Sequence, residues 1–291
     1  MILSRPIRQE GVPLDKLIVN LAPTGLKPSN PVNPNVPVSP GEIIRQVDEC
    51  AALGVSIVHL HAREEDGSPT HRKEIFRRII EGIRERRPDL VICVSVSGRA
   101  FPEFSLRSEP LDLEGDARPD MASLTLGSMN FYREASVNSP DTIRALAGKM
   151  AEKGIKPEIE IFDMAMIDQM KWLASKGFIT PPFYANLILG APIHQPLDPG
   201  RLALLVRELP PGTCWAGGAI GPAQPRVNAM AIAMGGHVRV GLEDNLHWDP
   251  GRSRLARNAE LVERVVGIGQ TLCREAATPS ETREILGLPQ R

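Results

Sequence analysis

Two histidines, one residue apart, end an apolar run in the stretch VSIVHLHAREEDGSPT, residues 55–70. In a β-strand the side chains at i and i+2 point the same way, so His59 and His61 project together from the carboxyl end of the strand. Two adjacent neutral imidazoles can chelate a divalent cation, and zinc is the usual choice where a carboxylate completes the ligands. The other reading, in which one histidine packs in the core and the other bonds a carbonyl, stays open for a bare H-x-H motif.

The third ligand is expected near the other end of the chain, in GHVRVGLEDN at 236–245. Arg239 and Glu243 share one face of a strand by the same alternation, and Asp244 follows where the strand becomes a loop. In a closed barrel this last strand lies close to the second strand, so Glu243 can reach the histidine pair across the mouth. The alternative is that Glu243 and Asp244 only cap the next helix and pair with nearby arginines.

The elements that must position these residues alternate along the chain. Eight short runs rich in β-branched residues recur, and helix-like stretches lie between most of them. Strands that are apolar on both faces indicate a parallel sheet covered by helices, and eight such units in 291 residues predict a closed (βα)8 TIM barrel, with a doubly wound open sheet as the runner-up. The expected strands are 16–22, 55–62, 90–97, 121–127, 158–162, 183–190, 213–221 and 237–243. The expected helices are 40–53, 71–87, 139–152, 163–176, 199–208, 226–234 and 252–273.

Irregular insertions interrupt this rhythm at about 24–40 and 99–120. In a barrel both would hang over the C-terminal mouth, where βα loops build active sites. Thr278 and Glu281 fit a capping box, which predicts a final helix at about 279–287. Because no interdomain linker is evident, residues 1–291 are expected to form a single barrel domain.

Composition excludes some classes of partner. Lys and Arg number 34 against 35 Asp and Glu, and only 4% of residues are aromatic, so nothing favours nucleic acid or an acidic membrane surface. No apolar run approaches the roughly 20 residues that span a bilayer. The four cysteines are far apart and form no C-x-x-C pair, as is typical of reduced thiols. We therefore expect a cytoplasmic protein that acts on small molecules.

The motifs H-L-H-x-R-x-x-D-G and G-x-E-D-N, together with APTG (22–25), MASLTLG (121–127) and PEIEIFD (157–163), resemble those of the β-keto acid cleavage enzymes. The resemblance runs nearly from end to end. It implies a zinc-bearing (βα)8 barrel, usually a homotetramer. It also implies an exchange of acyl groups between a β-keto acid and acetyl-CoA, which yields acetoacetate and a new acyl-CoA.

The resemblance also assigns roles to individual residues. It implies that zinc activates the keto acid, that a carboxylate base takes the C2 proton, and that the carbanion then attacks the acetyl-CoA thioester. The implied zinc ligands are His59, His61 and Glu243. The implied proton-transfer residues are Asp244 and Arg239, with Glu160 as an inward-facing acid. Glu160 could equally be an acid of the barrel interior that pairs with a neighbouring base. The implied substrate contacts are Ser95, Gly98 and Ser123, although each serine could equally be a turn or core hydroxyl.

Lys27 departs from the family pattern. Family members that bind an aminated keto acid carry Glu at this position. A lysine side chain would instead repel an ammonium group and attract a carboxylate. We therefore expect Lys27 to contact a substrate whose distal end is anionic or polar, as in a β-keto dicarboxylate. The alternative is that Lys27 is an exposed lysine of the loop. Arg99 stands where the family often has a small residue, and it either holds the same anion or faces solvent.

Two other functions use the same residues. A zinc-dependent barrel hydrolase or aldolase would employ a metal-bound water and no CoA. A non-catalytic metal-dependent binding protein would bind its ligand without turnover. The combination of Arg239, Glu243 and Asp244 exceeds what binding alone requires, which favours an enzyme.

Overall fold

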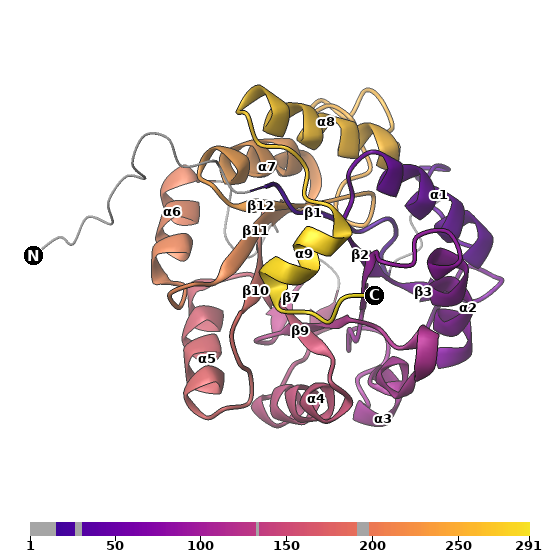
Figure 1. Cartoon of the computed structure of the whole chain (residues 1–291), viewed down its shortest axis with the longest axis vertical. Helices are drawn as coiled ribbons and strands as arrows, with labels where there is room; N and C mark the ends of the chain where they lie inside the picture. The colour runs from indigo at the N-terminus through magenta and orange to yellow at the C-terminus, as the bar shows by residue number, and fades with distance from the viewer. Residues whose placement is uncertain (1–15, 27–30, 132–133, 191–197) are drawn as a thin grey trace, which may run out of the picture.

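The computed structural model describes residues 16–26, 31–131, 134–190 and 198–291. Eight parallel strands close into a barrel in the order β1-β12-β11-β10-β9-β6-β5-β2 (Figure 1). The predicted (βα)8 barrel is confirmed and the open sheet is excluded, because β1 pairs with both β2 and β12. The barrel strands are β1 (Val19–Leu21), β2 (Ile57–Leu60), β5 (Val91–Val94), β6 (Met121–Thr125), β9 (Lys156–Ile161), β10 (Tyr184–Leu189), β11 (Cys214–Ala219) and β12 (His237–Val240).

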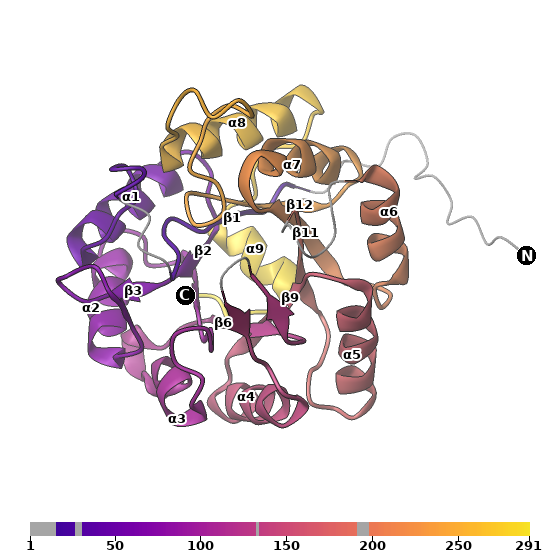
Figure 2. The ribbon, with the colours of Figure 1, turned by 180° about the vertical axis from the view of Figure 1, so that it is seen from behind.

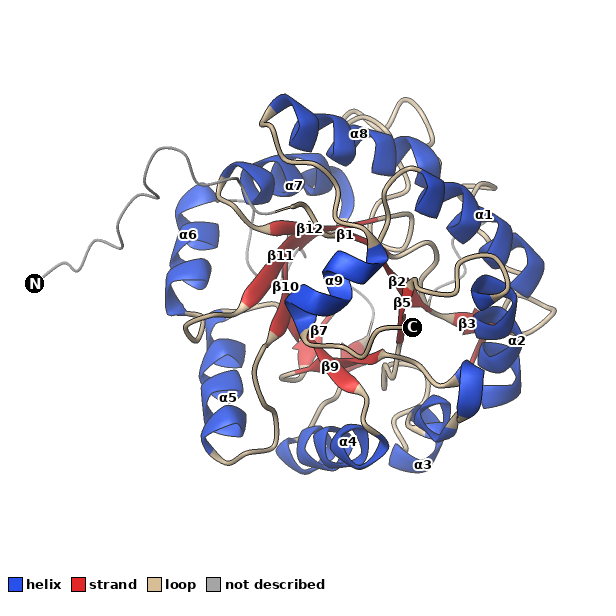
Figure 3. Ribbon diagram, viewed as in Figure 1, coloured by secondary structure: helices blue, strands red, loops and turns tan. Residues whose placement is uncertain are grey.

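Helices cover the outside of the barrel (Figure 3). They are α1 (Pro40–Ala52), α2 (Lys73–Arg84), α4 (Pro140–Lys153), α5 (Met164–Ser175), α6 (Pro199–Glu208), α7 (Gln224–Ala233) and α8 (Asn258–Thr271). The insertion between β5 and β6 contains the short helix α3 (Phe104–Arg107) and 3-10 turns at Glu109–Asp112 and Gly115–Ala117, and another 3-10 turn, Gly221–Ala223, precedes α7. Two small hairpins pair β3 (Ala62–Arg63) with β4 (Pro69–Thr70) and β7 (Met129–Asn130) with β8 (Ala135–Ser136). No helix within the described ranges is long and apolar enough to cross a membrane.

The helix starts follow the capping chemistry of the sequence. The Ser39 hydroxyl accepts a hydrogen bond from the Glu42 amide, which opens α1 with Pro40 in its first turn, and Ser139 caps α4 in the same way. The expected helix at 252–273 is wrong at its start, because α8 begins only at Asn258. The Asp249 carboxylate instead accepts hydrogen bonds from the amides of Ser253 and Arg254, which holds these residues in a loop.

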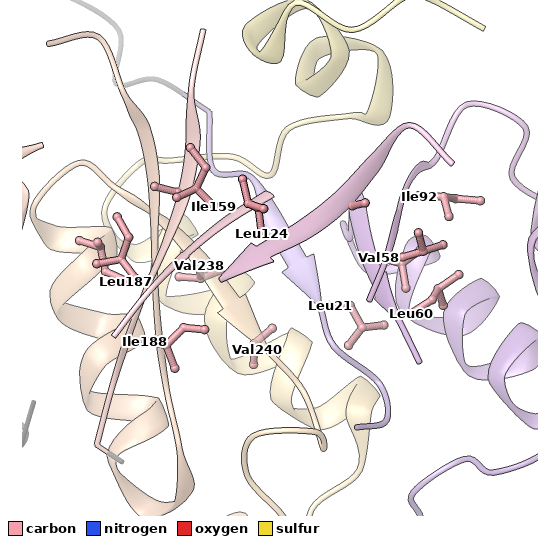
Figure 4. Close-up of a cluster of buried hydrophobic side chains, with 14 of the residues drawn as sticks. Leu21, Val58, Leu60, Ile92, Leu124, Ile159, Leu187, Ile188, Val238 and Val240 are labelled. Carbon is pink, nitrogen blue, oxygen red and sulfur yellow. The ribbon is translucent and has the colours of Figure 1, made fainter. Parts of the chain in front are cut away.

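Strand alternation divides each strand between two environments. Outward-facing side chains such as Val58, Leu60, Ile159 and Val240 form a hydrophobic layer beneath the helices (Figure 4). Inward-facing side chains change from apolar to polar along β2, β5 and β6. Ile57, Val91, Met121 and Ala216 fill the lower interior, and the residues two and four positions later point into the upper half. Counted from the start of β2, Ile57 is the first inward-facing residue, and His59 and His61 are the second and third.

The final helix closes the N-terminal end of the barrel. Helix α9 (Pro279–Leu286) begins with the predicted capping box of Thr278 and Glu281 and lies across the barrel axis (Figure 1). Leu286 joins the lower interior cluster, and Arg283 donates to the carbonyl oxygens of Asp89 and Leu90 just before β5. The opposite, C-terminal end, seen from behind in Figure 2, is left for the functional site.

A buried carboxylate ties this closing helix to the barrel. Asp120 accepts hydrogen bonds from Arg84, Arg283 and the Ile92 amide, at 2.9–3.1 Å. Burial alone would raise the pKa of Asp120, but the hydrogen bonds and charges of Arg283 and Arg84 hold it below its ordinary value. The contacts of Asp120 with the two arginines therefore stabilise the fold at pH values above the ordinary pKa of an aspartate. This stabilisation is lost when the pH falls through the lowered pKa of Asp120.

We expect Asp120→Asn to lower the free energy of unfolding by about 3–5 kcal/mol at neutral pH, because it leaves two buried guanidinium groups without their counter-charge. Urea unfolding at pH 7 measures the loss, which should shrink as the pH falls below about 4. Asp112→Asn is the matched control: its half-exposed pair with Lys149 should contribute about 1 kcal/mol or less. Similar losses for both variants would contradict the prediction.

Candidate active site

A polar pocket of about 190 Å³ lies at the carboxyl ends of the barrel strands. Both predicted insertions reach it, through Leu26 after β1 and through Arg99 after β5. Seven of the ten predicted site residues line it: His59, His61, Ser95, Glu160, Arg239, Glu243 and Asp244. The closed barrel therefore brings together the two ends of the chain that sequence analysis marked separately.

The two histidines and Glu243 face one another. His61 Nε2 lies 3.3 Å from Glu243 Oε1, and His59 Nε2 lies 3.9 Å from Glu243 Oε2. With zinc–ligand bonds of 2.0–2.1 Å, two donors on one tetrahedral ion are about 3.3 Å apart. Glu243 Oε2 is also buried without a hydrogen-bond partner among the described residues. The donor types and their spacing therefore fit a divalent cation, although ligation itself stays a prediction.

Arg239 stands at the centre of the charges. Its buried guanidinium lies 3.0 Å from a carboxylate oxygen of Asp244, 3.0 Å from Glu243, 3.3 Å from Glu160 and 3.9 Å from Glu158. Four carboxylates surround this guanidinium, and Arg63 and Arg99 add two positive charges that also act on Glu243, so the carboxylates still outnumber the guanidinium groups in a space that is mostly shielded from water. Such an excess is costly unless protons or a bound cation offset it.

The pKa values of the site follow from this crowding. Burial, opposed by Arg239 and reinforced by Glu243, raises the pKa of Asp244 to about 6, which suits a base that works near neutrality. Burial alone would also raise the pKa of Glu243, but Arg239 and the histidines hold it well below its usual range. Burial lowers the pKa of His61, which favours its neutral form. Burial opposes the imidazolium of His59, yet the charge of Glu158 raises its pKa on balance.

Close packing fixes the loop after β1 against the site. The buried Arg63, from the H-L-H-x-R motif, donates to the Gly25 carbonyl and lies 3.3 Å from the Thr24 hydroxyl. A Cβ atom on Gly25 would lie 2.7 Å from Glu243 Cγ. A glycine is therefore required for the loop to approach Glu243 this closely, which accounts for the glycine of the APTG motif.

Two predicted substrate contacts that the structure describes, Ser123 and Gly98, are not among the residues that line the pocket. Ser123 accepts a hydrogen bond from the Val96 amide, and Gly98 lies against Arg107, whose guanidinium donates to the Val96 carbonyl. Both positions thus support the turn after β5. Lys27 lies outside the described residues. Direct contacts of these three residues with substrate stay predictions.

Two polar residues of the site were not predicted from the sequence: Thr125, which lines the pocket, and Glu158, which does not. Glu158 is fully buried and contacts His59, and the Thr125 hydroxyl donates to Glu160 at 2.6 Å. A signal for Glu158 was present, because in PEIEIF it stands two residues before Glu160 and so shares its inward face. Nothing in the local pattern indicated which side chain of another strand Glu158 would contact.

Comparison with known proteins points to one family of enzymes. The model of the β-keto acid cleavage enzyme family matches residues 16–288. The chain is 41% identical over 277 residues to a 3-keto-5-aminohexanoate cleavage enzyme of Fusobacterium nucleatum subsp. nucleatum, with 94% of this chain and 99% of that protein aligned. It is 36% identical over 275 residues to a 3-oxoadipate:acetyl-CoA acetyltransferase of Cupriavidus necator, with 94% and 95% aligned.

Solved structures support the fold. A ternary complex of ObcA with a C4-CoA adduct and oxalate superposes with a TM-score of 0.79 and 21% sequence identity, over 88% of this chain and 68% of that one. The apo structure of ObcA gives a TM-score of 0.77 at 22% identity, over 88% and 66% of the two chains. At this identity the likeness concerns the barrel architecture.

Proposed function

Because the chain belongs to the β-keto acid cleavage enzyme family, we propose that it condenses a β-keto acid with acetyl-CoA to give acetoacetate and an acyl-CoA. The acetyl-CoA substrate is supported by the name of the 36% identical acetyltransferase. The observation that carries the proposal is the convergence of His59, His61 and Glu243 with Arg239 and Asp244 in one buried pocket.

We propose zinc as the cation held by His59, His61 and Glu243. The nitrogen and oxygen donors, their separations of 3.3 and 3.9 Å and the surplus of carboxylates support this choice. When bound there, zinc supplies Lewis acidity to the 3-oxo and carboxylate oxygens of the keto acid and so acidifies its C2 proton.

Asp244, Arg239 and Glu160 have different roles in the proton transfer. Asp244 takes the proton from C2, and Arg239, whose Nε lies 3.0 Å from Asp244 Oδ2, holds the carboxylate in position. Glu160, hydrogen-bonded by Thr125, holds the other side of the guanidinium at 3.3 Å. Ser95 lines the pocket and is available to donate to a substrate oxygen.

Bond changes complete the exchange. The C2 carbanion attacks the acetyl carbonyl of acetyl-CoA and releases CoA thiolate. The thiolate adds to the 3-oxo carbon, and cleavage of the C2–C3 bond returns the electron pair to C2, which takes up the proton held by Asp244. Acetoacetate leaves with C1 and C2 of the keto acid, and the remainder leaves as the acyl-CoA.

We propose that the distal end of the substrate is anionic. Arg99 lines the pocket with its guanidinium stacked 3.5 Å above the Phe131 ring, and its Nε lies 3.7 Å from Glu134. An arginine fixed by an aromatic ring presents its remaining donors to a planar anion. Lys27, outside the described residues, would add a second positive charge, and the relative that acts on 3-oxoadipate supports a dicarboxylate.

Arg99→Met tests this specificity. We expect KM for 3-oxoadipate to rise about 10–100-fold, because a charge-assisted hydrogen bond contributes about 1.5–3 kcal/mol. KM for 3-oxohexanoate, which has a methyl group in place of the distal carboxylate, should change little. Lys27→Glu is expected to disfavour the dicarboxylate in the same panel. Equal changes for both keto acids would show that Arg99 supports the loop and does not select the substrate.

The reaction itself is tested by incubating the zinc-loaded protein with a panel of β-keto acids and reading acetoacetate by mass spectrometry. Acetoacetate should form only when acetyl-CoA is present. Cleavage of the keto acid without acetyl-CoA would instead indicate the hydrolase or aldolase chemistry, and stoichiometric binding without turnover would indicate a binding protein.

A single barrel domain, a homotetramer and a cytoplasmic location are proposals as well. Family resemblance supports the tetramer, and the exposed Trp172 on α5 and Leu204 on α6 offer apolar surface on neighbouring helices. Light scattering coupled to gel filtration measures the number of subunits directly.

A further inference from the structure

We propose that Glu158 is a positioning residue for the cation site: its carboxylate fixes the tautomer and the orientation of His59 so that Nε2 faces the cation. This inference rests on the proposed cation site of His59, His61 and Glu243. It goes further, because it assigns a role to a residue that contributes no ligand and does not line the pocket.

The contact between Glu158 and His59 determines which ring nitrogen carries the hydrogen. Glu158 Oε2 lies 2.5 Å from His59 Nδ1, and both side chains are buried. An ionised carboxylate can only accept hydrogen bonds, so Nδ1 must carry a hydrogen. A neutral imidazole with its hydrogen on Nδ1 presents the lone pair on Nε2, and His59 Nε2 is the atom that faces Glu243.

Glu158 is itself held from several strands. Its Oε1 accepts a hydrogen bond from Asn20 Nδ2 on β1 at 2.6 Å, and the Cys93 thiol on β5 donates to Oε2 at 3.2 Å. Asn20 donates in turn to the Tyr184 hydroxyl on β10, and Arg239 on β12 lies 3.9 Å from Oε2. This polar layer lies on the apolar lower interior of the barrel and leaves Glu158 little freedom to turn away from His59.

The same atoms do not form a second cation site. His59, Cys93 and Glu158 also group three possible ligands, but the separations of 2.5 Å from Nδ1 to Oε2 and 3.2 Å from Sγ to Oε2 are hydrogen-bond lengths. Donors on one zinc ion are about 3.3 Å apart for nitrogen and oxygen, and farther apart where sulfur takes part. Cys93 and Glu158 therefore hold the Nδ1 side of the His59 ring, while Nε2 on the opposite side faces the pocket.

A fully buried carboxylate is costly to keep for packing alone. Glu158 has no exposed surface, and the guanidinium of Arg239, 3.9 Å away, is shared with three other carboxylates. A partner that orients a metal-binding histidine typically changes metal affinity about 10–100-fold when it is removed. The position of Glu158 beneath His59 matches that role.

The test measures zinc affinity of the purified full chain by competition with a chromophoric chelator. Glu158→Gln should raise the Kd for zinc about 10–100-fold, because the amide loses the charge and can present its NH2 group to Nδ1, which moves the ring hydrogen to Nε2. Asp120→Asn is the matched control. It removes another buried carboxylate from the far end of the barrel, so it should lower stability and leave the Kd unchanged.

A second readout needs no variant. In the zinc-loaded wild type, two-bond nitrogen–proton NMR spectra of 15N-histidine-labelled protein should show His59 with a hydrogen on Nδ1 and the metal on Nε2. An unchanged Kd in a folded Glu158→Gln variant, or a metal on Nδ1, would overturn the role of Glu158 and leave the proposed function standing. A wild type that binds no zinc would overturn the cation site and this inference together.

Discussion

Asp244→Asn is expected to lower kcat about a thousandfold, since a positioned general base typically contributes 10²–10⁴-fold. Asparagine keeps the shape of the side chain and its contact with Arg239 but cannot take the C2 proton. KM should change much less than kcat, because the proposed role concerns proton transfer and not binding. Burial raises the pKa of Asp244 to about 6, so the wild-type carboxylate is ionised at neutral pH and still basic enough to act.

Steady-state kinetics of acetoacetate formation measure this effect. Exchange of the C2 hydrogens of the keto acid with deuterated water, followed by NMR in the absence of acetyl-CoA, isolates the proton-transfer step. The enzyme should accelerate this exchange and the variant should not. Asp168→Asn, which alters a mostly exposed carboxylate on α5, serves as the control. A variant that retains more than a tenth of wild-type kcat would rule out Asp244 as the base.

Loss of the cation is the second large effect. His61→Ala should weaken zinc binding by more than about 100-fold, since it removes a ligand and not only a supporting group. Elemental analysis of dialysed protein should find about one zinc per wild-type chain and far less in the variant. Acetoacetate formation should fall with the metal content, and zinc should restore activity to chelator-treated wild type but not to the variant.

His71→Ala is the matched control for this experiment. His71 also pairs with a carboxylate, at 2.7 Å from Glu109, but it is not among the residues that line the pocket. The His71→Ala variant should therefore keep its zinc and most of its activity. Full activity in metal-free wild type, with His61→Ala equally active, would show that the reaction needs no cation.

Much of the site could be predicted because β-strands alternate strictly. The pairs His59 with His61, and Arg239 with Glu243, follow from spacing alone, and the barrel was indicated by eight apolar runs separated by helical stretches. The capping residues Ser39, Ser139 and Thr278 located the starts of three helices, since their hydroxyl groups accept hydrogen bonds from amides in the first turn.

The remainder depends on how strands are aligned in three dimensions. The parallel register that sets Asn20 opposite both Ile57 and Arg239 determines which inward residues share a layer, and a single sequence does not fix it. For this reason the contact of Glu158 with His59 was missed, although Glu158 faces inward by alternation. The late start of α8 was missed because the Asp249 side chain competes for backbone amides that a helix would use.

The most direct test of the proposed reaction follows the acetyl carbons through one turnover. Zinc-loaded enzyme is incubated with unlabelled 3-oxoadipate and acetyl-CoA carrying 13C at both acetyl carbons, and the products are read by mass spectrometry and carbon NMR. The proposed exchange predicts acetoacetate labelled at C3 and C4 together with unlabelled succinyl-CoA. Unlabelled acetoacetate, or cleavage at the same rate without acetyl-CoA, would contradict it.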